Sequence, residues 1–420
     1  MNPFLQNPRK LEDCLVPWSE LYIAPYDKNS VDPYTRTRVI LANGSEFASV
    51  WLSHHFSRHC PDNELRRQIA LLRRAEQQQQ KRISMLKPAN ETILEHTIGY
   101  EQLAVDLTAA LAQMVPDPYV KQALDFALLE DFDHLYRYAD LLDMEAGIHA
   151  EDLVGRYTEI MPGRPTLSHH RHPFDSIQRS IDPSAQTMTK LAVGVITSAE
   201  QQTMNFYMNV CGIYQSEIGR KLYQEIGMVE EEHVSQYASL LNPQATWLEK
   251  LLTQQYAECW LYWSATQTEK DPRIRAFWEE LFEEEITHLH FAANLLKHFE
   301  NKEWQQILPD GEFPQPLLLK SNIEYIRNIL RDTAQLTAVR ESWGDVDTLH
   351  SDFDFFRYQE MIQSDIETVP SHRVIEQYIE KNGVDYRWEV EQNPIPVLRE
   401  RNKDNTSVGR IPLQMHEMVR

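Results

Sequence analysis

Three stretches of the chain repeat one pattern around a histidine, and this repetition limits the possible folds more than any other feature. Each histidine follows an acid by three positions and is followed at +5 by alanine and at +7 and +8 by leucine. The acid and histidine pairs are Asp131 with His134, Glu230 with His233, and Glu285 with His288. A hydrophobic frame that recurs at a fixed offset predicts three copies of one helical hairpin.

One glutamate precedes each repeat at a similar distance. Glu101 and Glu200 each lie 33 residues before their histidine, and Glu258 lies 30 residues before its own. The acid-x-x-His spacing alone is weak evidence, since the chain contains a fourth such pair, Asp347 with His350, that lacks the frame. The shared frame and the upstream glutamates therefore carry the prediction of a repeated, functional unit.

The composition favours helices. The chain has 420 residues, of which 42% are hydrophobic and only 13 are glycine. It can bury a substantial core and form one large domain or two ordinary ones. Abundant Glu, Gln, Leu and Ala, with few runs of valine or isoleucine, predict an all-α fold.

The charge and the cysteines exclude several classes of function. A formal net charge of −22 argues against nucleic-acid and anionic-membrane partners, because no basic excess is present to neutralise phosphates. Four scattered cysteines, with no C-x-x-C pair, exclude a cysteine-based zinc or iron-sulfur site. The start of the sequence lacks the apolar core of a secretory signal, and no run of eighteen apolar residues occurs, so we expect a cytoplasmic protein.

Three regions are expected along the chain. Residues 1–88 form an N-terminal extended segment and two supporting helices, residues 89–300 the helical core, and residues 301–420 C-terminal helices and a polar tail. In the first region, proline spacing predicts extended chain over 1–44, then helices from Ser45 to about His59 and from Asp62 to Met85. Glu76, on the second helix, is a minor additional site candidate.

The three hairpins are expected at about 90–144, 184–241 and 244–299. Their turns are predicted at Pro116-Asp117-Pro118, at 212–216 and at Lys270-Asp271-Pro272. In the first hairpin the turn proline lies midway between Glu101 and Asp131, so both acids should sit at one height on paired helices. Only Asn242-Pro243 separates the second hairpin from the third, which predicts a tight, antiparallel connection between the two.

The remaining segments have less regular patterns. Residues 145–183 should form a long loop, in which the run from His169 to His172 is expected to be solvated rather than metal-binding. Helices are predicted over 321–341 and 352–366, and the chain from Glu391 onward reads as a poorly packed extension.

The repeated residues are typical metal ligands. Residues three apart share one helix face, so the acid and histidine of each pair can reach the same point inside a bundle. Carboxylates and imidazoles together suit iron, manganese or zinc, and bridging carboxylates can hold two cations about 3.5–4 Å apart. Several carboxylates directed into one interior would repel one another unless cations or protons neutralised them.

Two of the repeats carry a family resemblance. Ala199-Glu200-Gln201 with Glu230-Glu-Glu-His233, and Ala257-Glu258-Cys259 with Glu285-Ile-Thr-His288, resemble the ferritin-like di-iron carboxylate superfamily. That superfamily includes rubrerythrins, ribonucleotide reductase small subunits and bacterial multicomponent monooxygenases. The resemblance covers about residues 90–300 and implies a ferritin-like bundle with one glutamate from each of two helices and Glu-x-x-His from each of two others.

A four-helix site needs two hairpins, and the sequence offers three. The long loop at 145–183 fits the crossover of the superfamily and favours the first hairpin with the second. The aspartate at 131, where the superfamily has glutamate, favours the second with the third, and Glu130 is a possible substitute for it. The candidate ligands are therefore Glu101, Asp131, His134, Glu200, Glu230, His233, Glu258, Glu285 and His288.

The resemblance implies an oxidoreductase that activates dioxygen or peroxide at two iron ions, with manganese as the alternative, and oxidises a small, largely apolar molecule. No catalytic side chain beyond the ligands is expected. Ile196, Met204 and Tyr207, on the face of Glu200, are either core packing or the wall of a substrate pocket. The cysteine pairs of rubrerythrins are absent, so electrons must come from a separate reductase, the substrate or peroxide.

Two other functions stay open. One is iron oxidation or storage without an organic substrate, and the other is a helical interaction protein that has kept the scaffold but no metal. The sequence is compatible with a homo-oligomer and does not identify the substrate.

Overall fold

The computed structural model describes residues 1–163, 170–383 and 385–388, and it is all-α apart from one short β-hairpin. The helices are α1 (Pro33–His59), α2 (Asn63–Met85), α3 (Ile93–Met114), α4 (Pro118–Ala146), α5 (Ala150–Leu153), α6 (Thr187–Ile213), α7 (Glu217–Leu240), α8 (Trp247–Thr268), α9 (Pro272–Glu300), α10 (Ile323–Thr333), α11 (Asp354–Ile362) and α12 (Pro370–Asn382). The strands are β1 (Leu336–Val339) and β2 (Ser342–Asp345), which pair antiparallel.

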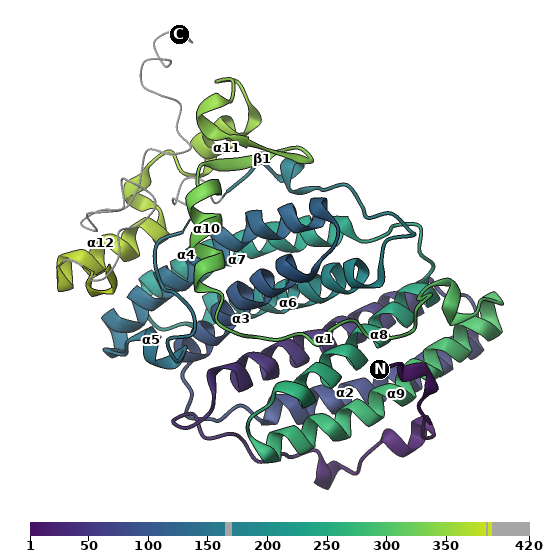
Figure 1. Cartoon of the computed structure of the whole chain (residues 1–420). Helices are drawn as coiled ribbons and strands as arrows, with labels where there is room; N and C mark the ends of the chain where they lie inside the picture. Colours follow the sequence, from purple (N-terminus) through teal and green to yellow (C-terminus); the bar gives the residue numbers. More distant parts are fainter. Residues whose placement is uncertain (164–169, 384, 389–420) are drawn as a thin grey trace.

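The eight long helices form two groups of four (Figure 1). In the first group, α3 pairs with α4 and α6 with α7, and the two pairs pack on each other. In the second group, α1 pairs with α2 and α8 with α9, again packed together. The second group therefore combines the first two and the last two long helices in sequence order, and the first group comes between them in the sequence.

The three expected hairpins and their turns are present. The helix α3 ends at Met114 and α4 begins at Pro118, while α8 ends at Thr268 and α9 begins at Pro272. Both second helices start at an Asp-Pro pair, in which the aspartate caps the first turn and the proline needs no hydrogen-bond partner. Capping boxes at Thr92 and Thr246 fix the starts of α3 and α8.

The N-terminal region differs from the prediction. The helix α1 begins at Pro33, not at Ser45, because Asp32 accepts from the Tyr34 backbone and Pro33 occupies the first turn. The expected helix from Asp62 to Met85 is confirmed, with Asp62 as its cap. Neither helix is a peripheral support, since both belong to the second group of four. The predicted domain boundaries remain a prediction.

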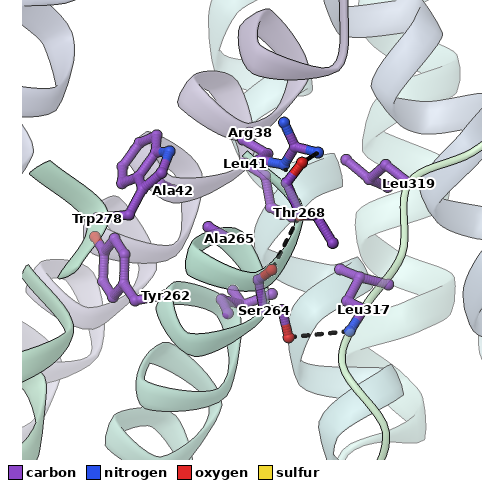
Figure 2. A pocket seen from close by; sticks show the side chains of 11 residues that line it. Arg38, Leu41, Ala42, Tyr262, Ser264, Ala265, Thr268, Trp278, Leu317 and Leu319 are labelled. Carbon is purple, nitrogen blue, oxygen red and sulfur yellow. Dashed lines mark hydrogen bonds between the residues drawn. The ribbon is translucent and has the colours of Figure 1, made fainter. Parts of the chain in front are cut away.

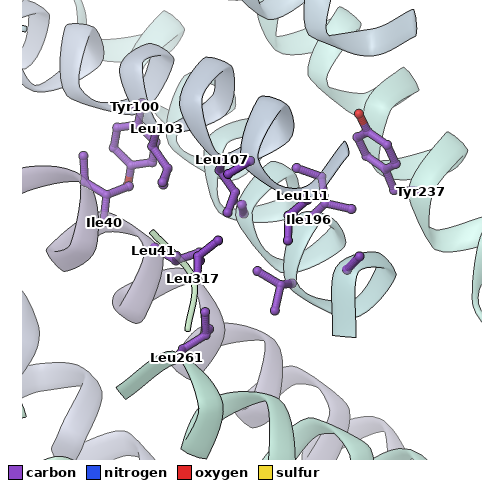
Figure 3. Close-up of a cluster of buried hydrophobic side chains, with 14 of the residues drawn as sticks. Ile40, Leu41, Tyr100, Leu103, Leu107, Leu111, Ile196, Tyr237, Leu261 and Leu317 are labelled. Atoms are coloured by element: carbon purple, nitrogen blue, oxygen red, sulfur yellow. The ribbon is translucent and has the colours of Figure 1, made fainter. Parts of the chain in front are cut away.

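The second and third hairpins have the predicted short connection, but they lie in different groups. The helix α8 packs chiefly on α9 and α1 and touches the second hairpin through α6. Residues 241–246 carry the chain from one group to the other. The seam between the groups is apolar: Figure 3 shows Leu41 and Leu261 of the second group beside Leu317, facing Leu103 and Leu107 of the first.

The C-terminal region was only partly predicted. The expected helix over 321–341 ends at Thr333, and the β-hairpin follows, with Arg340 in the left-handed region at φ 59°. Trp343 of β2 stacks on Phe126 of α4 at a ring separation of 4.0 Å, a tertiary contact that no helical pattern reports. The expected helix over 352–366 is the shorter α11. The predicted polar tail from Glu391 lies outside the described residues.

In the described part of the chain, none of the helices combines the length and the apolar character that crossing a membrane would require.

Candidate metal centre

The first group of helices brings six of the predicted ligands together. They are Glu101 on α3, Asp131 and His134 on α4, Glu200 on α6, and Glu230 and His233 on α7, and each is fully buried. The acid and histidine of each acid-x-x-His pair share a helix face and point inward together. We call these six residues the first cluster.

Ligand atoms of the first cluster fall into two sets that share one residue. Oxygen or nitrogen atoms of Glu101, His134 and Glu230 lie within 4.8 Å of one another. The same holds for Asp131, Glu200, Glu230 and His233. Glu230 belongs to both sets, through different neighbours, which is the arrangement that a carboxylate bridging two cations requires.

Each of the two imidazoles lies against a carboxylate from the opposite hairpin, and His233 also lies near two carboxylates of its own hairpin. Nδ1 of His134 is 3.1 Å from Oε1 of Glu230. Nδ1 of His233 is 3.1 Å from Oδ1 of Asp131, 3.4 Å from Oε2 of Glu230 and 3.8 Å from Oε2 of Glu200. The two hairpins therefore exchange contacts at the centre of the group.

The first cluster has oxygens without hydrogen-bond partners. Both oxygens of Glu200 and one oxygen of Glu101 are buried and make no hydrogen bond, while the other Glu101 oxygen accepts from the Tyr207 hydroxyl at 2.5 Å. Leaving a buried charged oxygen unpaired is costly, so such atoms point to a cation or a proton as their partner.

The electrostatic environment agrees. Burial, followed by repulsion from neighbouring carboxylates, raises the pKa of Asp131 to about 7. Burial is also the main cause that raises the pKa of Glu200 to about 7 and that of Glu101 well above its usual value. Burial opposes protonation of His233, but the adjacent Asp131 raises the pKa of this imidazole well above its usual value. Such clustered shifts are typical of functional sites.

Glu130, considered as a substitute for Asp131, has a different position. Its Oε2 lies 2.7 Å from Nε2 of His233, the ring nitrogen opposite to the one that faces Asp131. Arg171, from the loop between α4 and α6, donates to both Glu130 oxygens at 2.8 and 3.0 Å. Glu130 thus orients the imidazole from outside the cluster, and Asp131 is the acid inside it.

The run from His169 to His172 is not the solvated loop that the sequence predicted. His170 and Arg171 are buried, and Nε2 of His170 lies 3.4 Å from Glu225. His169 lies outside the described residues. The buried charge of Arg171 is held by Glu130, so an anionic partner explains why a cation enters the interior here.

We predict that Arg171→Gln weakens both the fold and metal binding. The substitution leaves the Glu130 carboxylate buried beside His233 without its cation, which should cost about 3–5 kcal/mol of unfolding free energy. Metal affinity should fall about 10–100-fold, as for other groups that orient ligands. Urea unfolding and metal titration measure both effects. The double variant Glu130→Gln/Arg171→Gln should recover most of the stability, and a single variant as stable as wild type would contradict this role.

The third hairpin contributes to a different place. Glu258, Glu285 and His288 are buried in the second group, beside Glu46 of α1 and Glu76 of α2. The structure brings the candidate ligands of the first hairpin together with those of the second, and it separates both from those of the third, so the nine candidate ligands do not form one cluster.

The sequence contained a signal for the missing half of the second group. Thirty-three residues separate Glu46 from Gln79, the same distance as from Glu101 to His134 and from Glu200 to His233. Glu76 precedes Gln79 by three positions, so α1 and α2 are a partial fourth copy of the hairpin, in which glutamine stands in place of histidine and only Leu86 of the hydrophobic frame is kept. A search for histidines alone misses this copy.

The residues considered for a substrate pocket lie mainly in the core. Ile196 and Tyr207 are fully buried, and Met204 is partly buried. The Tyr207 hydroxyl is occupied by its hydrogen bond to Glu101. None of the three lines the larger cavity, of about 700 Å³, which lies where α1 and α8 meet α6. A smaller cavity of about 30 Å³, lined by Tyr262 and Leu317 among others, has room for about one or two waters (Figure 2).

Comparisons of the chain with protein-family models, with curated proteins and with solved structures found no match.

Proposed function

We propose that the first cluster binds two iron ions and that the protein is an oxidoreductase that activates dioxygen or peroxide there. The observation that carries the proposal is the pair of ligand sets that share the buried carboxylate of Glu230. Manganese is the alternative metal, since the same carboxylates and imidazoles suit both.

The charge of the first cluster supports two cations. Its four carboxylates carry four negative charges when ionised, which two divalent cations would balance. Six ligand residues with two imidazoles also match donor types that suit iron. Protons alone could neutralise part of the charge, but they would not explain why all six side chains point to the same place inside the helix group.

The arrangement of ligands supports a ferritin-like site. One glutamate comes from each of α3 and α6, and an acid-x-x-His pair comes from each of α4 and α7, which is the pattern of the ferritin-like di-iron proteins. The long connection from α4 to α6 supports the same assignment, because those proteins join their two hairpins by a crossover. Asp131, in place of glutamate, is the one departure from the pattern.

The residues around the cluster have definable roles. The bound metal ions would supply the capacity to activate dioxygen or peroxide. Glu101, Asp131, Glu200 and Glu230 would hold and bridge the ions, while the two histidines complete their coordination. The Tyr207 hydroxyl donates to Glu101 and holds that carboxylate in one orientation. Full burial of the six ligands excludes bulk water from them.

The proposed substrate is a small, largely apolar molecule, and electrons would come from a separate reductase, from the substrate or from peroxide. Iron oxidation without an organic substrate is the second candidate. The full burial of Ile196 and Tyr207 favours it, because these side chains leave little access for an organic molecule beside Glu200.

Oxygen consumption by the iron-loaded protein tests the proposal. We expect dioxygen uptake after ferrous iron is added without oxygen and the solution is then mixed with air, and no uptake by a His134→Ala/His233→Ala variant. Uptake that continues catalytically when candidate apolar substrates are added selects the oxidase, and uptake limited to the added iron selects iron oxidation. An iron-loaded wild type without uptake of dioxygen or peroxide would exclude both.

A further inference from the structure

The second group of helices contains a buried acidic cluster of its own. Glu46 on α1, Glu76 on α2, Glu258 on α8, and Glu285 with His288 on α9 are each at most 1% exposed. Ligand atoms of Glu76, Glu285 and His288 lie within 4.8 Å of one another, and so do those of Glu46, Glu76 and Glu258. We call these five residues the second cluster. Its two sets share Glu76, as those of the first cluster share Glu230.

Several buried polar atoms at the second cluster make no hydrogen bond. They include both oxygens of Glu76, one oxygen each of Glu46 and Glu285, and Nε2 of His288. Gln79, one turn from Glu76 and 1% exposed, faces both Glu284 and Glu285, but its contacts with them fall short of full hydrogen-bond geometry. The buried Gln79 amide, with its hydrogen bonds incomplete, is therefore evidence for a missing ligand that is independent of the acidic residues.

We propose that the second cluster is a separate binding site for divalent metal ions, with Glu76 bridging them and the Gln79 amide oxygen as an additional ligand. The site does not rest on the function proposed for the first cluster, since it uses other residues on other helices. Four carboxylates again balance two divalent cations.

The second cluster favours a harder cation than the first. It has one imidazole where the first cluster has two, and a glutamine amide takes the place that the second imidazole would occupy. Carboxylate and amide oxygens suit manganese and magnesium, whereas imidazole adds affinity for iron and zinc. Manganese is therefore the appropriate probe.

The larger cavity gives the second cluster a path for ions. Gln254 and Ala257 of α8 line this cavity. The Gln254 amide also donates to Oε1 of Glu258, at 3.2 Å, and so stands between the cavity and the cluster. Glu249 lines the same cavity together with Lys190 and Lys250, so the cavity lining has no excess of negative charge. A cation entering here would meet the Gln254 amide before it reached Glu258.

Manganese binding by the full chain tests the proposal. Metal-free wild type, Glu76→Gln, Glu230→Gln and the double variant are titrated with Mn²⁺, and bound metal per chain is counted after desalting. We expect about four ions in wild type, about two in each single variant and none in the double variant, because each acid bridges one pair of ions. Glu279→Gln, an exposed substitution on α9, is the control and should retain all ions.

The effect of Glu76→Gln decides the outcome. The second site is supported if Glu76→Gln lowers the bound metal by at least one ion per chain, both in the wild-type background and in the Glu230→Gln background. No loss in either background overturns it, whatever Glu230→Gln does. Retention of all ions by Glu230→Gln would count against the first cluster instead. Circular dichroism checks folding, and Glu285→Gln replaces Glu76→Gln if that variant does not fold.

Discussion

Glu230→Gln is expected to remove both metal ions of the first cluster and to lower any oxygen-dependent activity by more than about 100-fold. Substitution of residues that only orient metal ligands lowers activity by up to about 100-fold, so loss of a ligand should have a larger effect. The reason is geometric, because Glu230 alone belongs to both ligand sets. Glutamine keeps the size of the side chain and removes the charge, so the fold should be retained. Metal analysis and oxygen-uptake rates give the two readouts.

The same variant should be close to wild type in stability when both are free of metal. Glutamine removes the repulsion from neighbouring carboxylates, but it also removes the charge that lies 3.1 Å from Nδ1 of His134 and 3.4 Å from Nδ1 of His233. With metal present wild type should be the more stable protein, since only wild type gains the binding energy. Glu231→Gln, at the adjacent exposed position, is the matched control and should change neither quantity. Equal metal content in Glu230→Gln and wild type would contradict the shared role of Glu230.

The metal-free protein is expected to lose stability as the pH rises from about 4 to about 7. Burial raises the pKa of Glu200 from its usual value of 4.5 to about 7. The unfolded chain therefore releases this proton near pH 4.5, while the folded chain keeps it until about pH 7. Folding takes up a proton between these values, so the stability contributed by this group is fully present below the unfolded pKa and decreases until the folded pKa is passed.

A comparison with Glu200→Gln isolates this effect from the other titrating groups. Glutamine resembles the protonated acid, so the two metal-free proteins should be equally stable near pH 4.5. The variant should then become more stable by roughly 3 kcal/mol above pH 7, since one pKa unit corresponds to about 1.36 kcal/mol. Urea unfolding at several pH values measures the difference. A difference that does not change with pH would show that Glu200 is not protonated in the folded, metal-free protein. Added metal should reverse the trend, because the ions bind the deprotonated acids.

Much of the first cluster could be predicted from sequence because its signals are local. The acid-x-x-His spacing is one helix turn, and each turn between helices is marked by proline or glycine. Glu101 and Asp131 could be placed at one height from their equal distances to Pro116. These features depend on residues near one another in the chain, and the structure brings the expected side chains together.

The partnership of the hairpins depends on contacts that local patterns do not contain. The fourth copy, α1 with α2, has Gln79 where histidine would complete the motif, and its start at Asp32-Pro33 resembled an extended proline-rich segment. Its partner hairpin, α8 with α9, begins 162 residues after α2 ends. Arg171 similarly comes from a loop whose polar composition suggested solvent, and its ion pair with Glu130 and its position over the Phe126 ring explain its burial. The β-hairpin at 336–345 is stabilised by the packing of Trp343 on Phe126.

Anomalous X-ray diffraction from crystals of the full chain, loaded with ferrous iron in the absence of oxygen, is the most direct measurement of the first cluster. We expect two peaks at the iron edge among α3, α4, α6 and α7, on either side of Glu230 and about 3.5–4 Å apart. The proposed metal centre would be contradicted by crystals in which no peak lies among these four helices and the carboxylates of Asp131, Glu200 and Glu230 hydrogen bond to one another or to water.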